Sequence, residues 1–364
     1  MLSFKKHTIF RWMQGALLCL LIGCDDPLSE LPEEVRYLSF TPEVTQTRAA
    51  MVNAFPENGK FGVIGFLYVR NDKGETSSGE SPWDTKKVLI KPEPDMYNME
   101  VTYAHKTTSY DPPRAWSGNA NDKYTFFAYY PFQNGANGNG ISITDTKSLG
   151  SPVLTYLLPY KANELNDYSA VPDVMIASKY DHQKKHGTVR FNFNHVLSCV
   201  DFAVNNLNTS NKIRLTSLLL EGTINERTQV IMDGMTQTPD SMIKSKFQFV
   251  PTGSLDVEST LAHKAVSVGE RNNNYLLLIP QEKPSDWKVT VKWDMLDKDG
   301  YELKDDQGNK RTGTYSQAIG KSLTFLAGKK HTFTLNFLGD VCTIIAQVGD
   351  WETPPGEDNN VEFE

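Results

Sequence analysis

The stretch from residue 189 to residue 204 constrains the fold most, because its apolar residues follow the alternation of a β-strand. Val189, Phe191 and Phe193 alternate with polar residues, which is the period of a half-buried strand. Around residues 195–198 the phase slips, and the apolar side then continues from Val200. A slip of one residue turns the opposite face of a strand inward. The pattern therefore predicts a bulge, or a bend that takes the strand from one packing surface to another.

The rest of the sequence is typical of an all-β protein. Short apolar or alternating runs are separated by turn-rich stretches such as 71–82 and 134–140, and no window carries the long apolar stripe of a helix. Strands at this spacing predict sandwiches, in which two antiparallel sheets share one core. The expected strands are residues 35–44, 61–69, 96–103, 124–132, 141–144, 153–158, 171–177, 213–220, 228–232, 247–250, 275–279, 287–295, 323–325, 332–338 and 343–348.

A polar and charged stretch, residues 178–187, separates two strand-rich halves, each of the size of a domain. We place the domain boundary there, which gives an N-terminal domain of residues 35–185 and a C-terminal domain of residues 186–364. The uncertainty of this boundary is about 20 residues, because the central alternating stretch could instead close the first domain.

The N-terminus has the pattern of a secretory signal peptide. Three basic residues come first, an apolar run at residues 15–22 follows, and a glycine precedes a cysteine. The apolar run is far short of the about 20 residues that cross a bilayer as a helix. Its end, Leu21-Ile22-Gly23-Cys24, resembles the lipobox of bacterial lipoproteins. This predicts a signal peptide of residues 1–23, cleavage between Gly23 and Cys24, and lipids on Cys24.

The charge that remains after processing argues against nucleic acid as a partner. The chain has 364 residues, with 37 basic and 44 acidic side chains. Since residues 1–23 hold three of the basic side chains and no acidic one, the mature chain carries a formal charge of −10. This acidity, without a basic cluster, does not favour nucleic acid or anionic lipid head groups. Attachment to the outer membrane would rest on the lipids of Cys24, with residues 24–34 as a tether.

Cys199 and Cys342 are the cysteines that can carry thiols after processing. Two cysteines in a chain of this length form no disulfide framework. A bridge between them stays open outside the cytoplasm, but the apolar neighbours of Cys199 favour two buried free thiols.

Candidate metal sites in the sequence are incomplete. His182 and His186 have the helical spacing of two ligands, but they flank two lysines and lack an apparent third ligand. The stretch 297–300 matches the inner part of an EF-hand loop, yet its first and twelfth ligand positions hold Met295 and Asp306. A hairpin turn fits this stretch better. We predict no metal and no cofactor.

Catalytic motifs are equally weak. The glycine-rich run 135–140 does not open a helix after a strand, and neither G-x-S-x-G nor H-E-x-x-H occurs. His195 lies on the central alternating stretch, where a structural role is expected. Two acids at glycosidase distance follow no spacing rule, so that possibility stays open. We predict that the protein is not an enzyme.

Six motifs resemble those of the fimbrillin family, which includes major fimbrial subunit-like and Mfa-like proteins. In chain order they are Tyr124-x-Phe126-x-Ala128-Tyr129-Tyr130-Pro131, Pro172-Asp173-Val174-Met175-x-Ala177, Phe191-x-Phe193-x-His195-x-Leu197-x-x-Val200-x-Phe202-x-Val204, Tyr275-x-x-Leu278-Ile279-Pro280-Gln281, Ala327-Gly328-Lys329-x-x-x-Phe333-Thr334-Leu335 and Val348-x-x-Trp351. The resemblance implies two tandem transthyretin-like Greek-key β-sandwich domains. It also implies export as a lipoprotein and assembly with other pilus subunits into surface pili.

The resemblance further implies a maturation step. In such proteins a trypsin-like protease cuts after an arginine near the mature N-terminus, which removes the first strand and opens a groove for a strand of a neighbouring subunit. Arg48-Ala49, just behind the strand expected at residues 35–44, occupies the corresponding place. The candidate donor strand is the C-terminal arm, residues 341–364, with Val361 and Phe363 as the side chains that would fill the groove.

We therefore predict a structural subunit of a cell-surface pilus, acting as stalk, tip or anchor and supporting adhesion. Asp25-Asp26 resembles the acidic tag that sends some lipoproteins to the outer face of the outer membrane. The alternative is a monomeric surface lipoprotein that binds a glycan or a host protein, with Trp83 and Trp116 stacking on sugar rings. Asp240-Ser241-Met242 resembles an O-glycosylation motif.

Overall fold

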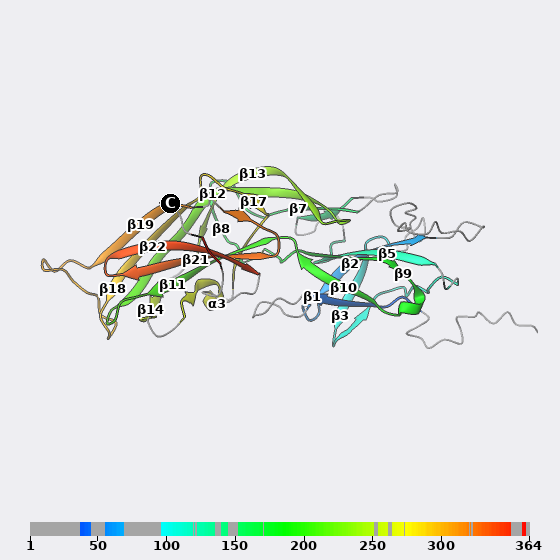
Figure 1. The fold of residues 1–364 in the computed structure, drawn as a ribbon, viewed down its shortest axis with the longest axis horizontal. Coiled ribbons are helices and arrows are strands. Elements are labelled where there is room, and N and C mark those ends of the chain that lie inside the picture. The colour runs from blue at the N-terminus through cyan, green and yellow to red at the C-terminus, as the bar shows by residue number, and fades with distance from the viewer. Residues whose placement is uncertain are drawn as a thin grey trace, which may run out of the picture.

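The computed structural model describes most of the chain between Tyr37 and Val361. The described residues are 37–44, 55–68, 96–118, 120, 122–134, 140–144, 152–169, 171–250, 254–260, 264–272, 274–319, 321, 323–350 and 359–361. They form strands almost throughout, with one 3-10 turn, η1 (Lys184–His186), and one short helix, α3 (Val268–Asn272). This confirms the prediction of an all-β fold. The molecule is elongated, with two strand-rich lobes side by side (Figure 1).

The first lobe is built on a seven-stranded sheet. Its order is β1 (Phe40–Val44), β10 (Val189–His195), β9 (Met175–His182), β5 (Lys123–Tyr130), β2 (Lys60–Tyr68), β3 (Met99–Ala104) and β4 (Thr107–Ser109). Both faces of this sheet are buried. Phe61, Phe126 and Phe191 belong to one core cluster, whereas Phe127 and Tyr129 belong to a second, larger cluster.

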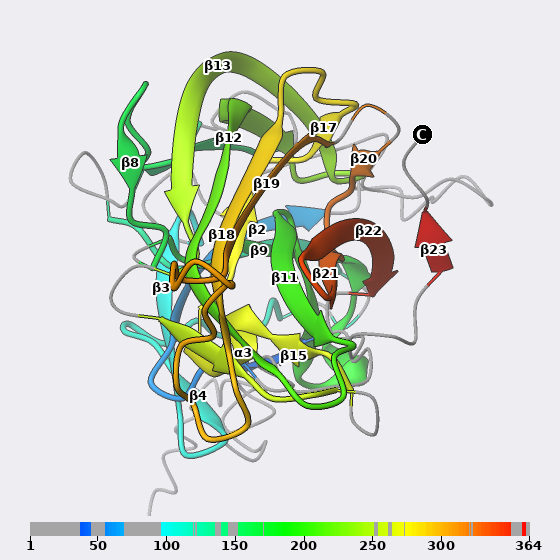
Figure 2. The same cartoon turned by 90° about the vertical axis from the view of Figure 1, so that its left-hand side faces the viewer.

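The second lobe consists of two facing layers (Figure 2). One layer has the order β15 (Val266–Ser267), β11 (Ser198–Asn206), β21 (Lys329–Leu338), β22 (Val341–Asp350) and β23 (Asn359–Val361), with β16 (Leu276–Leu278) also on β11. The other has the order β19 (Thr312–Ala318), β18 (Lys288–Leu296), β12 (Lys212–Ile231), β13 (Thr236–Gln248) and β8 (Leu165–Asn166). Phe202 and Phe333 of the first layer share a core cluster with Leu220 and Val289 of the second, as in a sandwich.

The long strand β12 links the two lobes. Its beginning pairs with β18 and β14 (Leu255–Val257), and its end pairs with β7 (Val153–Leu157), which in turn pairs with β6 (Ile141–Ile143). The β12–β13 hairpin therefore extends from the second lobe towards the first (Figure 1). A separate two-stranded sheet pairs β17 (Gln281–Glu282) with β20 (Thr324–Phe325).

The central alternating stretch divides at its phase slip. β10 ends at His195 in the seven-stranded sheet, and β11 begins at Ser198 in the second lobe. Between them Val196 donates its N–H to the carbonyl of Val174 at 2.9 Å, and Leu197 accepts from the N–H of Gly328 at 2.8 Å. Of the two predicted alternatives, the bend between packing surfaces is the one that occurs. The domain boundary at residue 185 stays a prediction, and β10 pairs within the sheet of the strands before it.

Two features differ from what the sequence predicts. Most of β13 and all of β19 are strands without an apolar alternation, because neighbouring strands pair with their backbones while many of their side chains are exposed. The sheets are also mixed, since β1 pairs in parallel with β10, β11 with β21, and β8 with β13. Cys199 and Cys342 are buried free thiols, as predicted.

Candidate functional site

The first strand, β1, is an outermost strand of the seven-stranded sheet. It pairs in parallel with β10, and the register runs from Phe40 opposite Val189 to Val44 opposite Phe193. Its residues alternate between buried and partly exposed, as the alternating sequence from Leu38 to Val44 dictates. This places one face of β1 in the core of the first lobe.

The buried face of β1 fills an aromatic core. Phe40 is 2% exposed, and its ring centroid lies 5.5 Å from that of Tyr110, 5.6 Å from that of Phe126 and 5.7 Å from that of Phe191. Burying a side chain of this size is worth about 1.5–3 kcal/mol relative to leaving it exposed. Without β1, these rings would face solvent, so β1 completes the core.

The side of β1 away from β10 is held by the segment around β4. The Tyr110 hydroxyl donates to the carbonyl of Leu38 at 2.6 Å, and the Thr108 hydroxyl donates to the carbonyl of Phe40 at 2.5 Å. Leu38 donates its own N–H to the carbonyl of Arg114 at 2.7 Å. The Tyr110 hydroxyl is a donor at neutral pH, as in any tyrosine, and burial raises its pKa further. The two outermost strands of the sheet are therefore joined partly through side chains.

The outward side of β1 makes exposed polar contacts. Arg190 donates to the carboxylate of Glu43 at 2.8 Å, with both side chains largely in solvent. The hydroxyls of Ser39 and Thr188 lie 2.9 Å apart. Such surface pairs contribute about 0–1 kcal/mol, so the core face of β1 dominates its attachment.

The predicted processing sites lie outside the described residues. These are Gly23 and Cys24 for lipidation, and Arg48 and Ala49 for the maturation cut. Arg48 follows the end of β1 in the sequence and precedes Phe55, the next described residue. Phe55 is 4% exposed and packs on Phe61 and Phe193 of the same core.

The predicted donor arm is partly described. β22 lies between β21 and β23, with Cys342, Ile344 and Ala346 buried. β23 pairs antiparallel with β22, and Val361 stands opposite Ala346. Phe363 lies outside the described residues. In this structure the arm thus comprises an inner strand, β22, which is paired on both sides, and the edge strand β23.

The weak metal candidates are explained by local structure. His182 is buried, its Nε2 lies 3.0 Å from the carbonyl of Gly187, and burial lowers its pKa. His186 is exposed, with its ring centroid 5.2 Å from that of His182. The described residues contain no group of three His, Cys, Asp or Glu side chains that could hold a metal ion.

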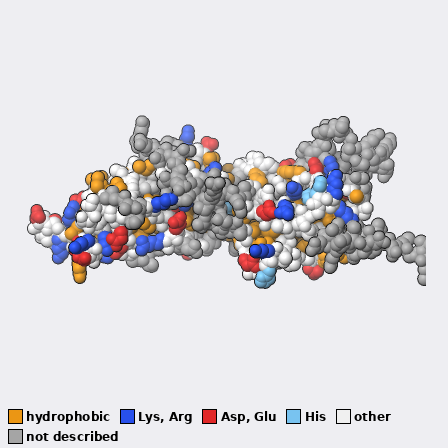
Figure 3. Space-filling view, turned by 60° about the horizontal axis from the view of Figure 1, so that its bottom comes forward, with side chains coloured by type: hydrophobic (Ala, Val, Ile, Leu, Met, Phe, Trp, Pro, Cys, Tyr) orange, Lys and Arg blue, Asp and Glu red, His pale blue; other side chains and the backbone are white. Residues whose placement is uncertain are grey.

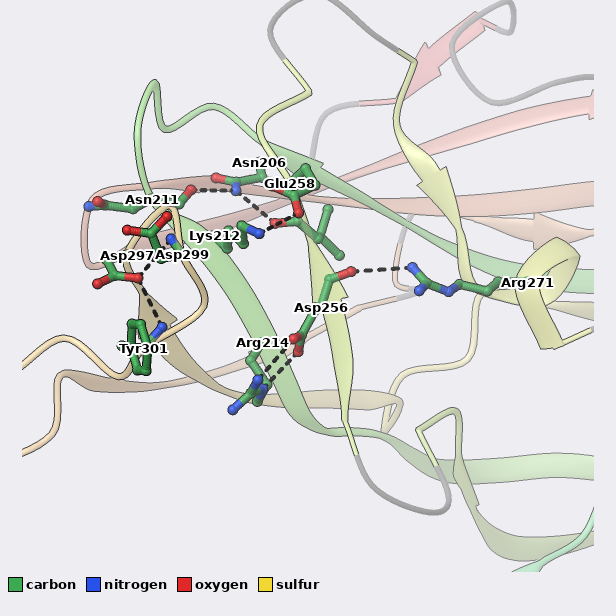
Figure 4. A network of polar contacts seen from close by, with 11 residues as sticks. Asn206, Asn211, Lys212, Arg214, Asp256, Glu258, Arg271, Asp297, Asp299 and Tyr301 are labelled. Carbon is green, nitrogen blue, oxygen red and sulfur yellow. Dashed lines mark hydrogen bonds and ion pairs between the residues drawn. The ribbon is translucent and has the colours of Figure 1, made fainter.

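The EF-hand-like stretch 297–300 is a turn, as predicted (Figure 4). The Asp297 carboxylate accepts the N–H groups of Asp299 and Tyr301, each at 2.9 Å. Two acidic side chains nearby form ion pairs with basic residues. Lys212 pairs with Glu258 at 2.7 Å, and Arg214 pairs with Asp256 at 2.7 Å.

Three other sequence candidates have structural surroundings. His195 lies 2.7 Å from the carboxylate of Asp173, at the bend between β10 and β11. Trp116, which the alternative function would need exposed for stacking on a sugar, is 3% exposed and packs edge-on against Tyr124, so it does not support that alternative. Trp83 lies outside the described residues. Ser241 donates to the carboxylate of Glu226 at 3.1 Å.

The sequence did not indicate a hollow of mixed polar and apolar lining on the second lobe. Its volume is about 580 Å³. Its lining includes Asn166, Asp167, Tyr168, Ser169, Gln248 and Asn274. Asp167 accepts from the N–H and hydroxyl of Ser169, which lowers the pKa of this carboxyl group. Residues from three separate segments meet here, so no sequence spacing could have revealed the hollow.

The fold and these surroundings define an elongated β-sandwich protein whose first strand is part of an aromatic core and whose last described strand is an edge. A model of fimbrillin-like proteins matches residues 47–351. The chain belongs to the fimbrillin-like family. This is a family of structural and adhesion proteins and not an enzyme family, and membership supports a role as a pilus subunit or in adhesion at the cell surface.

Solved structures that match this chain include two from Bacteroides species. A fimbrial protein from Bacteroides vulgatus matches with a TM-score of 0.62 and 20% identity, covering 87% of this chain and 99% of that one. A candidate cell adhesion protein from Bacteroides uniformis matches with a TM-score of 0.48 and 12% identity, covering 87% and 99%. The first of these supports the fold. No curated protein matches the sequence.

Acidic and basic side chains are interspersed on the face drawn in Figure 3. Among the described residues, no helix is both long and apolar enough to cross a bilayer.

Proposed function

We propose that this protein is a subunit of a cell-surface pilus, exported as a lipoprotein and assembled by exchange of its first strand. The observation that carries the proposal is the position of β1. It precedes Arg48 in the sequence, completes an aromatic core, and pairs along one side with β10. A cut after Arg48 would leave β1 attached by non-covalent contacts alone.

Loss of β1 would create a site for another strand. The backbone groups of β10 that now pair with β1 would become free, and Phe126 and Phe191 would line an apolar groove. An incoming strand satisfies both through main-chain hydrogen bonds and alternate side chains in pockets. The proposed donor is the arm at 341–364 of a neighbouring subunit, with Val361 and Phe363 as its apolar side chains.

The proposed route to the surface uses the N-terminus. Signal peptidase cleaves between Gly23 and Cys24, lipids on Cys24 hold the subunit in the outer membrane, and a trypsin-like protease then releases it by cutting between Arg48 and Ala49. An anchor subunit would keep its lipid and escape this cut. A stalk subunit would lose the lipid together with β1.

The test is mass spectrometry on the protein recovered from its own cell surface. We expect an N-terminus at Ala49 in material that runs as an SDS-resistant ladder. An Arg48→Ala variant should keep its N-terminus at lipidated Cys24 and form no ladder, whereas the neighbouring Thr47→Ala variant should behave as the wild type. Monomeric wild-type protein that begins at lipidated Cys24 would refute a stalk role.

A second candidate function is glycan binding, which the hollow at Asp167 and Asn274 favours. Amide, carboxylate and hydroxyl groups beside a tyrosine are the groups that bind sugar hydroxyls. On a glycan array, Asp167→Ala and Asn274→Ala should each lose the signal of the wild type, and Asp306→Ala, an exposed acid elsewhere, should keep it. An array without a wild-type signal would count against this function.

A further inference from the structure

The strand β19 is the longest of the outermost strands in the described sheets. It spans seven residues, Thr312–Ala318, whereas β1 has five, β4 and β23 have three each, and β8 has two. It pairs along one side with β18, and no described strand lies along its other side. An open edge of this length is a template for pairing with another strand.

The hydrogen-bond register shows which residues of β19 face outward. Ile319 donates its N–H to the carbonyl of Trp287, and Arg311 accepts from the N–H of Met295. In an antiparallel pair, residues bonded to the partner alternate with residues that face away. The odd-numbered residues of β19 therefore bond to β18. The backbone groups of Thr312, Thr314, Ser316 and Ala318 face away from it.

The open edge lacks the features that normally block such pairing. It contains no proline and no Lys, Arg, Asp or Glu. The outer side of β13 that β8 does not cover, by contrast, includes Pro239 and Asp240. The cations next to β19 are neutralised, because Lys310 pairs with Glu302 at 2.6 Å and Arg311 pairs with Asp340 at 2.7 Å.

The strand is also held flat on its sheet. Gly313 lies against the indole of Trp293, and a Cβ atom at this position would come within 2.0 Å of the ring. The hydroxyls of Ser316 and Thr290 lie 3.0 Å apart across the β18–β19 pair. The geometry of the edge is thus set by contacts within the chain.

We propose that β19 pairs antiparallel with β19 of a second copy of this chain, about a two-fold axis at Tyr315. This register places Thr314 opposite Ser316 and Thr312 opposite Ala318, so every outward backbone group meets a complementary one. The exposed side chains are small or β-branched and uncharged, so the strand opposes itself without like-charge repulsion. A charged partner strand would find no opposite charge on this edge.

The interface is small, so the pairing is weak in solution. A contact of this size corresponds to a dissociation constant on the order of 0.1–1 mM. Repeated along a filament, which rests on the proposed function, the same contact would join two pili side by side through multivalency. The dimer of the isolated chain does not depend on the pilus.

The test is sedimentation equilibrium of the full chain up to millimolar concentration. Thr314→Lys places two like charges diagonally across the axis on the same face, within reach of long side chains. Thr314→Pro removes an outward N–H that β18 does not use. Each should weaken the association at least tenfold while the far-UV spectrum and melting temperature stay near those of the wild type. The control is Thr216→Lys, an exposed threonine at the irregular position of β12 between Leu215 and Ser217, which β18 separates from β19 in the sheet, and it should associate as the wild type does.

Amide hydrogen exchange gives a readout that a folding defect would not reproduce. As concentration rises, the amides of Thr312, Thr314, Ser316 and Ala318 should become protected, and those of Gly313 and Tyr315 should stay protected throughout. A wild-type chain that is monomeric at every concentration would overturn the proposal. So would an association that survives Thr314→Pro, or one that protects another part of the molecule.

Discussion

β1 and β23 lie at the two ends of the described chain, and they are held in different ways. β1 inserts Phe40 among aromatic rings and is bonded on one side by β10 and on the other by Tyr110 and Thr108. β23 pairs by three residues with β22 at the edge of its sheet. The first strand is therefore a part of the core that must be replaced if it leaves, whereas the last strand can separate with little loss of stability.

Shortening the side chain that anchors β1 should cause the largest loss of stability. Phe40→Ala should lower the free energy of unfolding by about 3–5 kcal/mol, because it leaves a cavity among three rings. Urea denaturation followed by tyrosine and tryptophan fluorescence measures this loss. Thr41→Ala, the outward neighbour, should change it by less than about 0.5 kcal/mol. If both variants matched the wild type, β1 would not be part of the core.

Acid should weaken the sheet that carries β23 through His331 on β21. Its ring is fully buried, Nε2 donates to the carbonyl of Thr324 at 3.1 Å, and Nδ1 lies 3.2 Å from the hydroxyl of Ser198. Burial lowers the pKa of His331 to about 4, against about 6.5 in the unfolded chain. Its neutral form therefore stabilises the fold above pH 6.5, and this contribution is lost as the pH falls from about 6.5 to about 4.

The loss should reach about 2–3 kcal/mol near pH 4, because the unfolded chain then binds a proton that the folded chain binds poorly. Urea denaturation at a series of pH values gives the slope. His331→Gln should make the free energy of unfolding depend less steeply on pH between pH 6.5 and pH 4. The carboxyl groups also titrate in this range, but they contribute equally to both proteins. An unchanged slope would mean that His331 is not the group that titrates.

Some of these strands could be predicted from the sequence and others could not. The apolar alternation at Val189–Phe193 and the slip after it predict β10, the bend and β11, because core faces leave a periodic pattern. β19 escaped prediction because Thr312–Ala318 carries no such pattern and becomes a strand through its pairing with β18. The sequence left both packing and sugar stacking open for Trp116, because a single aromatic residue in a polar stretch does not reveal which core it enters, and the structure shows it buried.

The candidate site around β1 likewise has features that the sequence predicts and features that it does not. The sequence places Arg48 behind a short strand, which is local information. It does not indicate that Tyr110 and Thr108 hold the other side of that strand, because these residues lie about seventy positions further along the chain. Long-range hydroxyl contacts of this kind need the folded sheet to be seen.

Removing a hydroxyl on the side of β1 that faces β4 should have a smaller effect. Tyr110→Phe keeps the ring contact with Phe40. It removes two hydrogen bonds of the hydroxyl, the one it donates to the carbonyl of Leu38 and the one it accepts from the N–H of Arg114. We expect a loss of about 1 kcal/mol in the free energy of unfolding. The control is Tyr103→Phe, since the Tyr103 hydroxyl makes no hydrogen bond in the part of the chain that the structure describes. Equal stability of both variants would show that the hydroxyl does not hold β1.

The smallest effect should come from removing the last residues, 359–364. The backbone pairs of β23 with β22 are lost, but β22 keeps its full pairing with β21 and its buried Ile344 and Ala346. We expect a loss of less than about 1 kcal/mol, measured by the same urea denaturation. A loss as large as that of Phe40→Ala would place β23 in the core as firmly as β1. Strand exchange between subunits would then have to release two strongly held strands instead of one, and the C-terminal arm would no longer be the better donor.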